Sequence, residues 1–224
     1  MRTQLILVAT LMCLLFAGCA YDNYDEPNAM LSGKITYNGN PVGVRSNGTQ
    51  LEIWQDGFEL YSKIAVHIAH DGTYSAALFN GTYKVVRLAG APWEAQSKDT
   101  VTVEVRGNTV KDIEVQPFFA IKGESFQKSS DNVVAQFTID KVVNDASLKS
   151  VRFYFGNNIL VDQNRNAGAV NADLASINLG STSTLTAPIP ASLASKDYVF
   201  VRVGVQSDKS NEYIYTQVQK LQLK

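Results

Sequence analysis

The sequence predicts an all-β protein with two consecutive β-sandwich domains after a cleaved lipoprotein signal peptide. The first observation behind this is a series of turn dipeptides spaced along the chain. Asn and Gly adopt positive φ at low cost, so such dipeptides close hairpins. They are Asn38-Gly39, Asn47-Gly48, Asp56-Gly57, Asp71-Gly72, Asn80-Gly81 and Gly107-Asn108.

The second observation is that apolar and polar residues alternate between these turns, which is the period of a half-buried strand. After residue 20 only residues 171–177 suggest a helical turn, so many short strands with regular turns favour β-sandwiches. The clearest apolar rows are Val101, Val103 and Val105; Ile64, Val66 and Ile68; Val151, Phe153 and Phe155; and Val199, Val201, Val203 and Val205.

The third observation is that the prolines fall where strands are predicted to break, as expected of a residue that cannot donate to a sheet ladder. Pro117 divides the chain into two segments of normal sandwich size. We therefore predict one β-sandwich domain over residues 30–117 and a second over residues 118–224.

Residues 1–18 have the pattern of a secretory signal peptide. A short basic start is followed by an apolar run from Leu5 to Phe16 and then by small residues. Phe16-Ala17-Gly18-Cys19 resembles a bacterial lipobox, in which cleavage precedes the cysteine and the sulfur carries a diacylglycerol. The alternative is an ordinary signal peptide followed by a chance cysteine.

The cysteines favour lipidation of Cys19. The chain has two cysteines, and Cys13 lies in the removed segment. A lone thiol in an exported protein cannot form an internal disulfide. Residues 19–29 then form a lipidated tether, whose acidic part resembles the export signal of Bacteroidota surface lipoproteins, with a plain solvated linker as the alternative. The acidic residues are Asp22, Asp25 and Glu26.

Residues 31–116 carry a resemblance to a known domain type. Leu31–Tyr37 with Gly39–Val42 resembles the opening strand and turn of carboxypeptidase-regulatory-like domains, which are transthyretin-like sandwiches. His70–Tyr74 followed by Asn80–Val85 is similar to their second signature, a hairpin. With the lipobox and the tether, the whole chain resembles a Bacteroidota two-domain lipoprotein family of unknown function, which implies that residues 118–224 form an immunoglobulin- or fibronectin-like sandwich.

That resemblance implies a location and a class of partner. Its members are outer-membrane lipoproteins associated with glycan-uptake systems of the SusC/SusD type. The expected partners are therefore the membrane, through the lipid, and a glycan or SusC/SusD-like proteins at the cell surface.

The composition argues against several chemistries. The net charge of -1 gives no basic field for nucleic acid. The histidines, His67 and His70, would point to opposite faces of one strand, so we expect no metal site there. The loop Asp162-x-Asn164-x-Asn166, with Asp173, resembles a calcium loop but lacks its glycine, which favours a polar turn. We expect no catalytic residues, metal or cofactor.

Several aromatic residues alternate with the predicted core rows and are therefore expected to face outward. Trp54 shares the parity of Glu52, and Trp93 lies in a predicted loop, so these two are the candidate ligand-binding residues. Aromatic rings can stack on sugars, or they can pack between domains or across strands. The others are Tyr154, Tyr198, Phe200, Tyr213 and Tyr215.

Three functions remain open at this point. The favoured one is a non-catalytic surface lipoprotein that binds a glycan as an accessory module of an uptake system. The alternative is a structural spacer that mediates protein contacts without a small ligand. The third is an enzyme with dispersed carboxylates, which would need two of them about 5–9 Å apart in a cleft.

Overall fold

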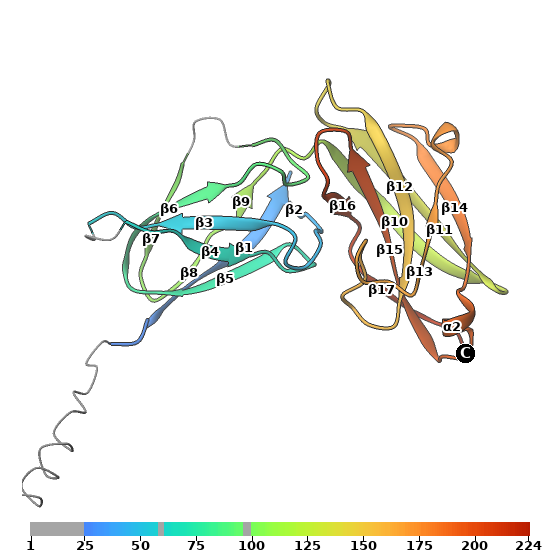
Figure 1. The fold of residues 1–224 in the computed structure, drawn as a ribbon, viewed down its shortest axis with the longest axis horizontal. Helices are drawn as coiled ribbons and strands as arrows, with labels where there is room; N and C mark the ends of the chain where they lie inside the picture. The colour runs from blue at the N-terminus through green and yellow to red at the C-terminus, as the bar shows by residue number, and fades with distance from the viewer. Residues whose placement is uncertain (1–24, 58–60, 96–99) are drawn as a thin grey trace, which may run out of the picture.

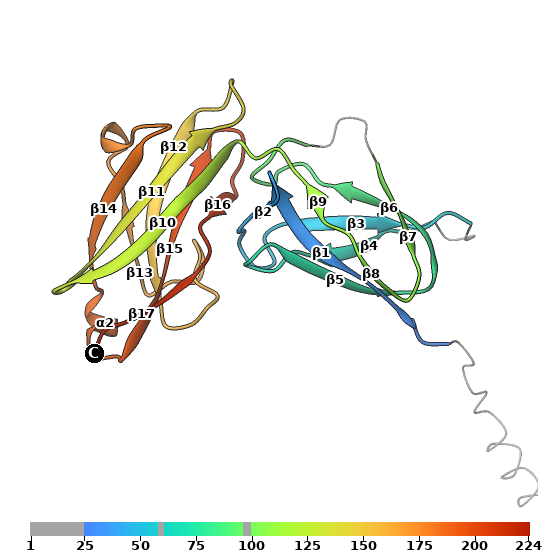
Figure 2. The same ribbon diagram turned by 180° about the vertical axis from the view of Figure 1, so that it is seen from behind.

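The computed structural model describes residues 25–57, 61–95 and 100–224 and shows two all-β domains joined near Pro117 (Figure 1). The predicted signal peptide, Cys19 and the start of the tether lie outside the described residues. The tether joins the end of the first domain that points away from the second domain (Figures 1 and 2).

The first domain has two sheets. One is built around β1, which pairs with β2, β5, β8 and β9; the other has the order β4-β3-β6-β7. Figure 2 views the domain from the side opposite to Figure 1. The strands are β1 (Ala29–Tyr37), β2 (Asn40–Pro41), β3 (Gln50–Trp54), β4 (Ile64–His67), β5 (Thr73–Leu78), β6 (Gly81–Arg87), β7 (Val101–Val105), β8 (Asn108–Val110) and β9 (Ile113–Glu114).

The second domain also has two sheets. The smaller has the order β10-β11-β14, and the larger has the order β13-β12-β15-β16, with β17 paired to β15 beside β16. The strands are β10 (Phe119–Ser129), β11 (Asn132–Lys141), β12 (Leu148–Gly156), β13 (Gly168–Asn171), β14 (Thr182–Pro188), β15 (Tyr198–Ser207), β16 (Tyr213–Tyr215) and β17 (Gln219–Gln222).

The alternation correctly identified much of the core. Leu51 and Ile53 of β3 are fully buried, and so is the valine row of β15 from Val199 to Val205. The helical turn suggested for residues 171–177 is present as a 3-10 helix, η1 (Leu174–Ser176), capped by the Asp173 side chain. A second short helix, α2 (Ala191–Ala194), was not predicted.

Four of the predicted hairpin turns connect the two sheets instead. Asn38-Gly39 does close a two-residue hairpin, with φ of 50° and 74°. By contrast, the strands on either side of four other dipeptides pair in different sheets: Asn47-Gly48, Asp71-Gly72, Asn80-Gly81 and Gly107-Asn108. A turn dipeptide provides a tight reversal, but it does not determine whether the next strand returns to the same sheet.

Candidate functional site

The two domains meet around a buried arginine on β15. Arg202 is fully buried, and its guanidinium donates to four backbone carbonyls: Val44 (3.0 Å), His70 (2.6 Å), Val161 (3.4 Å) and Thr216 (2.8 Å). The first two belong to the first domain. The guanidinium also lies 4.2 Å from the centroid of the Tyr215 ring. Burial lowers the pKa of Arg202 to about 10.

Further contacts hold the same junction. Gly43 forms a β-bridge with Tyr215 of β16, where an added Cβ would lie 2.5 Å from the Tyr215 carbonyl oxygen. Arg45 makes a two-point ion pair with Glu212 at 2.5 and 3.1 Å, and this hydrogen bond raises the pKa of Arg45. These contacts fix the relative placement of the two domains.

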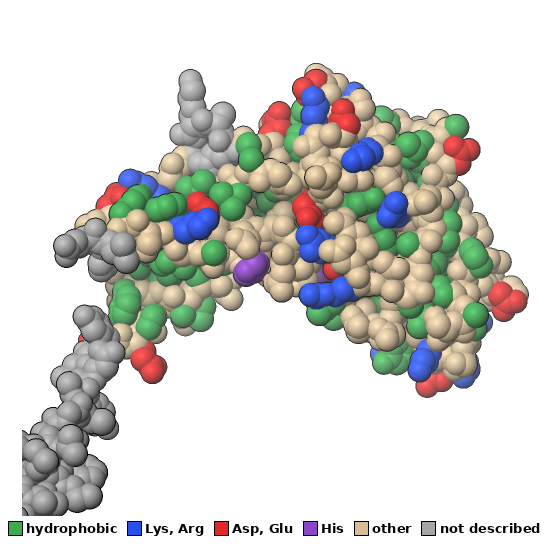
Figure 3. All heavy atoms as spheres, viewed as in Figure 1, with side chains coloured by type: hydrophobic (Ala, Val, Ile, Leu, Met, Phe, Trp, Pro, Cys, Tyr) green, Lys and Arg blue, Asp and Glu red, His purple; other side chains and the backbone are tan. Residues whose placement is uncertain are grey.

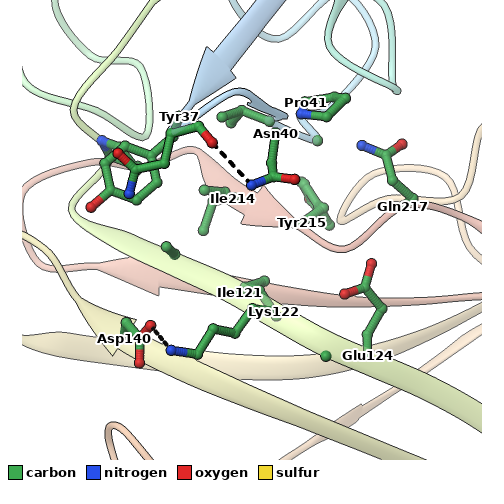
Figure 4. Close-up of a pocket in the computed structure, with 16 residues that line it drawn as sticks. Tyr37, Asn40, Pro41, Ile121, Lys122, Glu124, Asp140, Ile214, Tyr215 and Gln217 are labelled. Atoms are coloured by element: carbon green, nitrogen blue, oxygen red, sulfur yellow. Dashed lines mark hydrogen bonds and ion pairs between the residues drawn. The ribbon is translucent and has the colours of Figure 1, made fainter.

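A cleft of about 450 Å³ opens beside this junction (Figure 4). The first-domain wall is the hairpin between β1 and β2, which presents Tyr37, Asn40 and Pro41. The positive φ of Asn38 and Gly39 lets the hairpin reverse within two residues. Asn40 is held toward this turn by a 3.2 Å hydrogen bond from its amide to the Asn38 carbonyl.

The second-domain wall comes from β10 and β16. The register of β10 against β11 shifts between Lys122 and Ser125, so β10 contains a bulge, and Gly123 within it has φ of +63°. The bulge places Glu124 on the cleft wall, across from the hairpin in Figure 4. Lys122 forms an ion pair with Asp140.

The cleft combines apolar walls with unused polar groups. Ile121 and Ile214 line it together with Tyr37. Among the described residues, neither the Tyr37 hydroxyl nor the Glu124 carboxylate has a hydrogen-bond or ionic partner. Ligand sites commonly lie between domains and pair apolar surface with a few convergent polar groups. Such a lining suits a neutral ligand rich in hydroxyl groups.

Tyr37 also borders a second, more open hollow of about 530 Å³. Glu114 forms part of its wall, and its carboxylate accepts hydrogen bonds from the Thr36 hydroxyl (2.8 Å) and the Asn38 backbone N–H (2.6 Å). The carboxylate therefore supports the hairpin that carries Tyr37, which occupies the boundary between the two hollows.

The structure separates the two predicted ligand-binding tryptophans. Trp54 is half-buried on the outer face of β3, as its parity predicts, and its indole N–H donates to Glu52 at 3.3 Å. Its ring centroid lies 4.9 Å from that of Tyr61. Trp54 does not line the interdomain cleft.

The expectation that Trp93 is exposed and free to stack on a ligand is wrong. It is 1% exposed, and its segment forms a β-bridge with Pro117, where the chain leaves the first domain. Its indole N–H is buried without a partner. A loop position predicts exposure on average, but this loop packs against the domain linker.

Three of the other aromatics are also buried. A separate buried cluster consists of Tyr154, Tyr213, Tyr215 and Val161. At these positions the aromatic rings therefore pack across strands and between domains and do not stack on a ligand. Alternation placed them on the outer face correctly, but the loop carrying Val161 and the first domain cover that face. Tyr198 remains 38% exposed and contacts Phe200 edge to face.

The residues considered for metal binding have structural contacts. Asp162 is buried and accepts from the backbone N–H groups of Asn164 and Arg165, so it closes a polar turn. His67 is exposed on β4, and His70 lies beyond the strand. Within the described ranges, no group of three or more His, Cys, Asp or Glu residues is arranged to hold a metal ion.

Family profiles match nearly the whole described chain. Residues 29–116 match the "Protein of unknown function (DUF3823) N-terminal domain", and residues 119–220 match the "Domain of unknown function (DUF3823_C)". The chain belongs to the DUF3823 family. No curated protein matches it significantly.

Solved structures of this family show the same fold. A DUF3823 protein from Bacteroides ovatus ATCC 8483 is 44% identical, with a TM-score of 0.84, over 88% of this chain and 100% of the other. One from Parabacteroides merdae ATCC 43184 is 30% identical, with a TM-score of 0.80 and the same coverage. A Bacteroides uniformis ATCC 8492 protein named "putative carbohydrate binding protein" is 19% identical, with a TM-score of 0.71 over the same shares, a likeness of fold alone.

Tyr37 and Glu124 are the site residues that sequence reasoning missed. Tyr37 ends a strand just before an Asn-Gly turn, and Glu124 follows an isolated glycine within a strand pattern. A glycine in such a place is a known signal for a bulge, so Gly123 could have drawn attention to this segment.

Proposed function

We propose that the protein is a non-catalytic surface lipoprotein that binds a glycan in the cleft between its domains, as an accessory module of a glycan-uptake system. The observation that carries the proposal is the unpartnered Tyr37 hydroxyl and Glu124 carboxylate, which come from the two domains and lie toward opposite ends of a 450 Å³ cleft in Figure 4. An aromatic side chain provides a stacking surface, and a carboxylate accepts hydrogen bonds from sugar hydroxyls.

Two further points support a glycan as the ligand. A structural neighbour is named for carbohydrate binding, and the cleft has the volume of an ordinary small-molecule site. Stacking on one ring contributes about 0.5–1.5 kcal/mol, so useful affinity needs several contacts or many copies on the surface. The proposed lipid on Cys19 would supply many copies on one membrane.

The test is affinity electrophoresis of the protein in gels that contain one polysaccharide each, drawn from dietary and host sources. We expect retardation by at least one neutral polysaccharide and a loss of that retardation in Tyr37→Ala. Trp54→Ala serves as the matched aromatic control outside the cleft. Retardation that survives Tyr37→Ala and disappears in Trp54→Ala would place binding at the other predicted site, and no retardation of the parent would contradict the proposal.

The structural-spacer alternative has one specific observation in its favour. Arg202 and the Arg45–Glu212 pair hold the domains in one arrangement, which is what a rigid spacer requires. A spacer predicts that no polysaccharide in the panel retards the parent, so the same gels discriminate between the two functions.

A further inference from the structure

The exposed large hydrophobic side chains of the first domain gather at one end of it. The end is the one where the tether joins β1, which faces away from the second domain (Figure 1). Scattered exposed apolar residues need no explanation, but a group around one point does. The residues, with exposed fractions, are Met30 (39%), Tyr61 (52%), Ile64 (39%), Phe79 (42%) and Val110 (75%).

The strand pairings bring three of these residues beside the start of β1. Met30 is the second residue of β1, and its backbone N–H donates to Gly107 at 3.0 Å in the turn before β8. Phe79 directly follows Leu78, which pairs with Ala29. Val110 pairs with Ser32, two residues from Met30 on the same face.

The other two lie beside the loop that follows β3. Ile64 pairs with Ile53, and Tyr61 stacks near Trp54. Gln55, the residue after β3, adjoins the β5–β6 turn, because a Cβ added at Gly81 would lie 2.6 Å from its amide nitrogen. Figure 3 shows hydrophobic side chains on the first domain beside the point where the tether joins.

Six charged side chains near this end form ion pairs, while Asp25, Glu26 and Lys111 are exposed beside β1 and β8. Ion pairs join Lys63 to Glu52 (2.5 Å), Lys84 to Asp56 (2.7 Å) and Arg106 to Glu104 (2.5 Å). A pair of opposite charges produces a weaker electric field at a nearby apolar surface than a single charge does. The end is therefore suited to an interface between water and lipid, where amphipathic and aromatic side chains concentrate.

We propose that this end of the first domain, defined by Met30, Tyr61, Ile64, Phe79 and Val110, rests on the lipid surface to which the protein is anchored. The inference relies on the lipidation of Cys19 in the proposed function. Ala29 is ten Cα-to-Cα steps from Cys19, a span of at most about 36 Å, so the anchor keeps this end close to the bilayer. The interdomain cleft is then held away from the membrane.

The test places a tryptophan at the most exposed position. The mature protein is isolated in its lipidated form and reconstituted into phosphatidylethanolamine and phosphatidylglycerol vesicles with brominated acyl chains. Val110→Trp, Leu179→Trp and the parent are compared. Leu179 is 43% exposed in the second domain and is the matched control. We expect bromine to quench the added emission of Val110→Trp and to leave that of Leu179→Trp unchanged.

Three results would overturn the proposal. The first is unquenched Val110→Trp emission in protein that floats with the vesicles. The second is emission shielded from aqueous acrylamide but not quenched by bromine, which indicates a protein partner or a second copy on this surface. The third is failure of the parent to float, which removes the anchor. Polysaccharide binding is measured on the same vesicles. Absence of glycan binding by the cleft and absence of membrane contact by this end of the first domain therefore give different results.

Discussion

The guanidinium of Arg202, on the central strand of the second domain, donates a 3.0 Å hydrogen bond to the backbone carbonyl of Val44 in the first domain. The side chain has no exposed surface, so this charge is shared between two domains and held by neutral carbonyl groups. Arg202 is therefore one of the residues that hold the domain arrangement in which the cleft forms, together with the Arg45–Glu212 pair.

Replacing this arginine should loosen the junction. A hydrogen bond to a charged group contributes about 1.5–3 kcal/mol, and four carbonyls lose their donor, while removal of a buried cation offsets part of the loss. We expect Arg202→Ala to lower the free energy of unfolding by about 2–4 kcal/mol and to increase the radius of gyration in solution scattering.

The control for that experiment is Arg165→Ala. Arg165 is exposed in the same domain, so its removal should change stability by less than about 0.5 kcal/mol. Equal stabilities of the Arg202 and Arg165 variants, with unchanged scattering, would contradict the role assigned to Arg202.

Trp93 should behave as a core residue and not as a ligand contact. Because the side chain is 1% exposed, Trp93→Ala leaves a large cavity and should cost about 3–5 kcal/mol in urea unfolding. Trp93→Phe should cost clearly less, since the indole N–H has no partner to lose. A Trp93→Ala variant as stable as the parent would show that the residue is not packed as described.

The buried tyrosines make the fold sensitive to alkaline pH. Burial raises the pKa of Tyr74 to about 12, and it also raises the pKa of Tyr154 and of Tyr215. Unfolded tyrosines ionise near pH 10, so above that pH the unfolded chain binds fewer protons than the folded chain and stability falls.

Arg202 acts in the opposite direction over the same range. Its lowered pKa lets the folded chain release this proton first, which favours folding as the pH rises from about 10 toward the ordinary arginine value. Three tyrosines outweigh one arginine, so urea midpoints measured at about pH 8, 9.5 and 11 should decline above pH 10. A constant or rising midpoint would refute this balance of groups.

The lipid anchor gives a prediction of its own. Cys19 is the one cysteine outside the predicted signal peptide, so Cys19→Ala should abolish acylation and release the protein from membranes. Fractionation of cells that express each form provides the measurement. The idea fails if the Cys19→Ala protein stays with the membrane fraction as completely as the parent.

The strands were predictable because burial imposes a period of two on each of them. Val199 to Val205, and Trp54 opposite Ile53, lie on the faces that alternation assigns. Alternation cannot say what covers an outer face, so it left open whether Tyr154 and Tyr215 contact a ligand or are covered, and they lie under a loop and the first domain. The cleft was not predictable because Tyr37 and Glu124 come from different domains, and only tertiary packing brings them together.

The central claim is that the interdomain cleft binds a glycan, and calorimetric titration tests it most directly. The saccharide that gives the strongest retardation is titrated into the parent, Tyr37→Ala, Glu124→Gln and the control Trp54→Ala. We expect parent-like binding by Trp54→Ala, about a tenfold loss for Tyr37→Ala from the missing stacking surface, and a smaller loss for Glu124→Gln. Affinities for Tyr37→Ala and Glu124→Gln that equal the parent's would contradict the account.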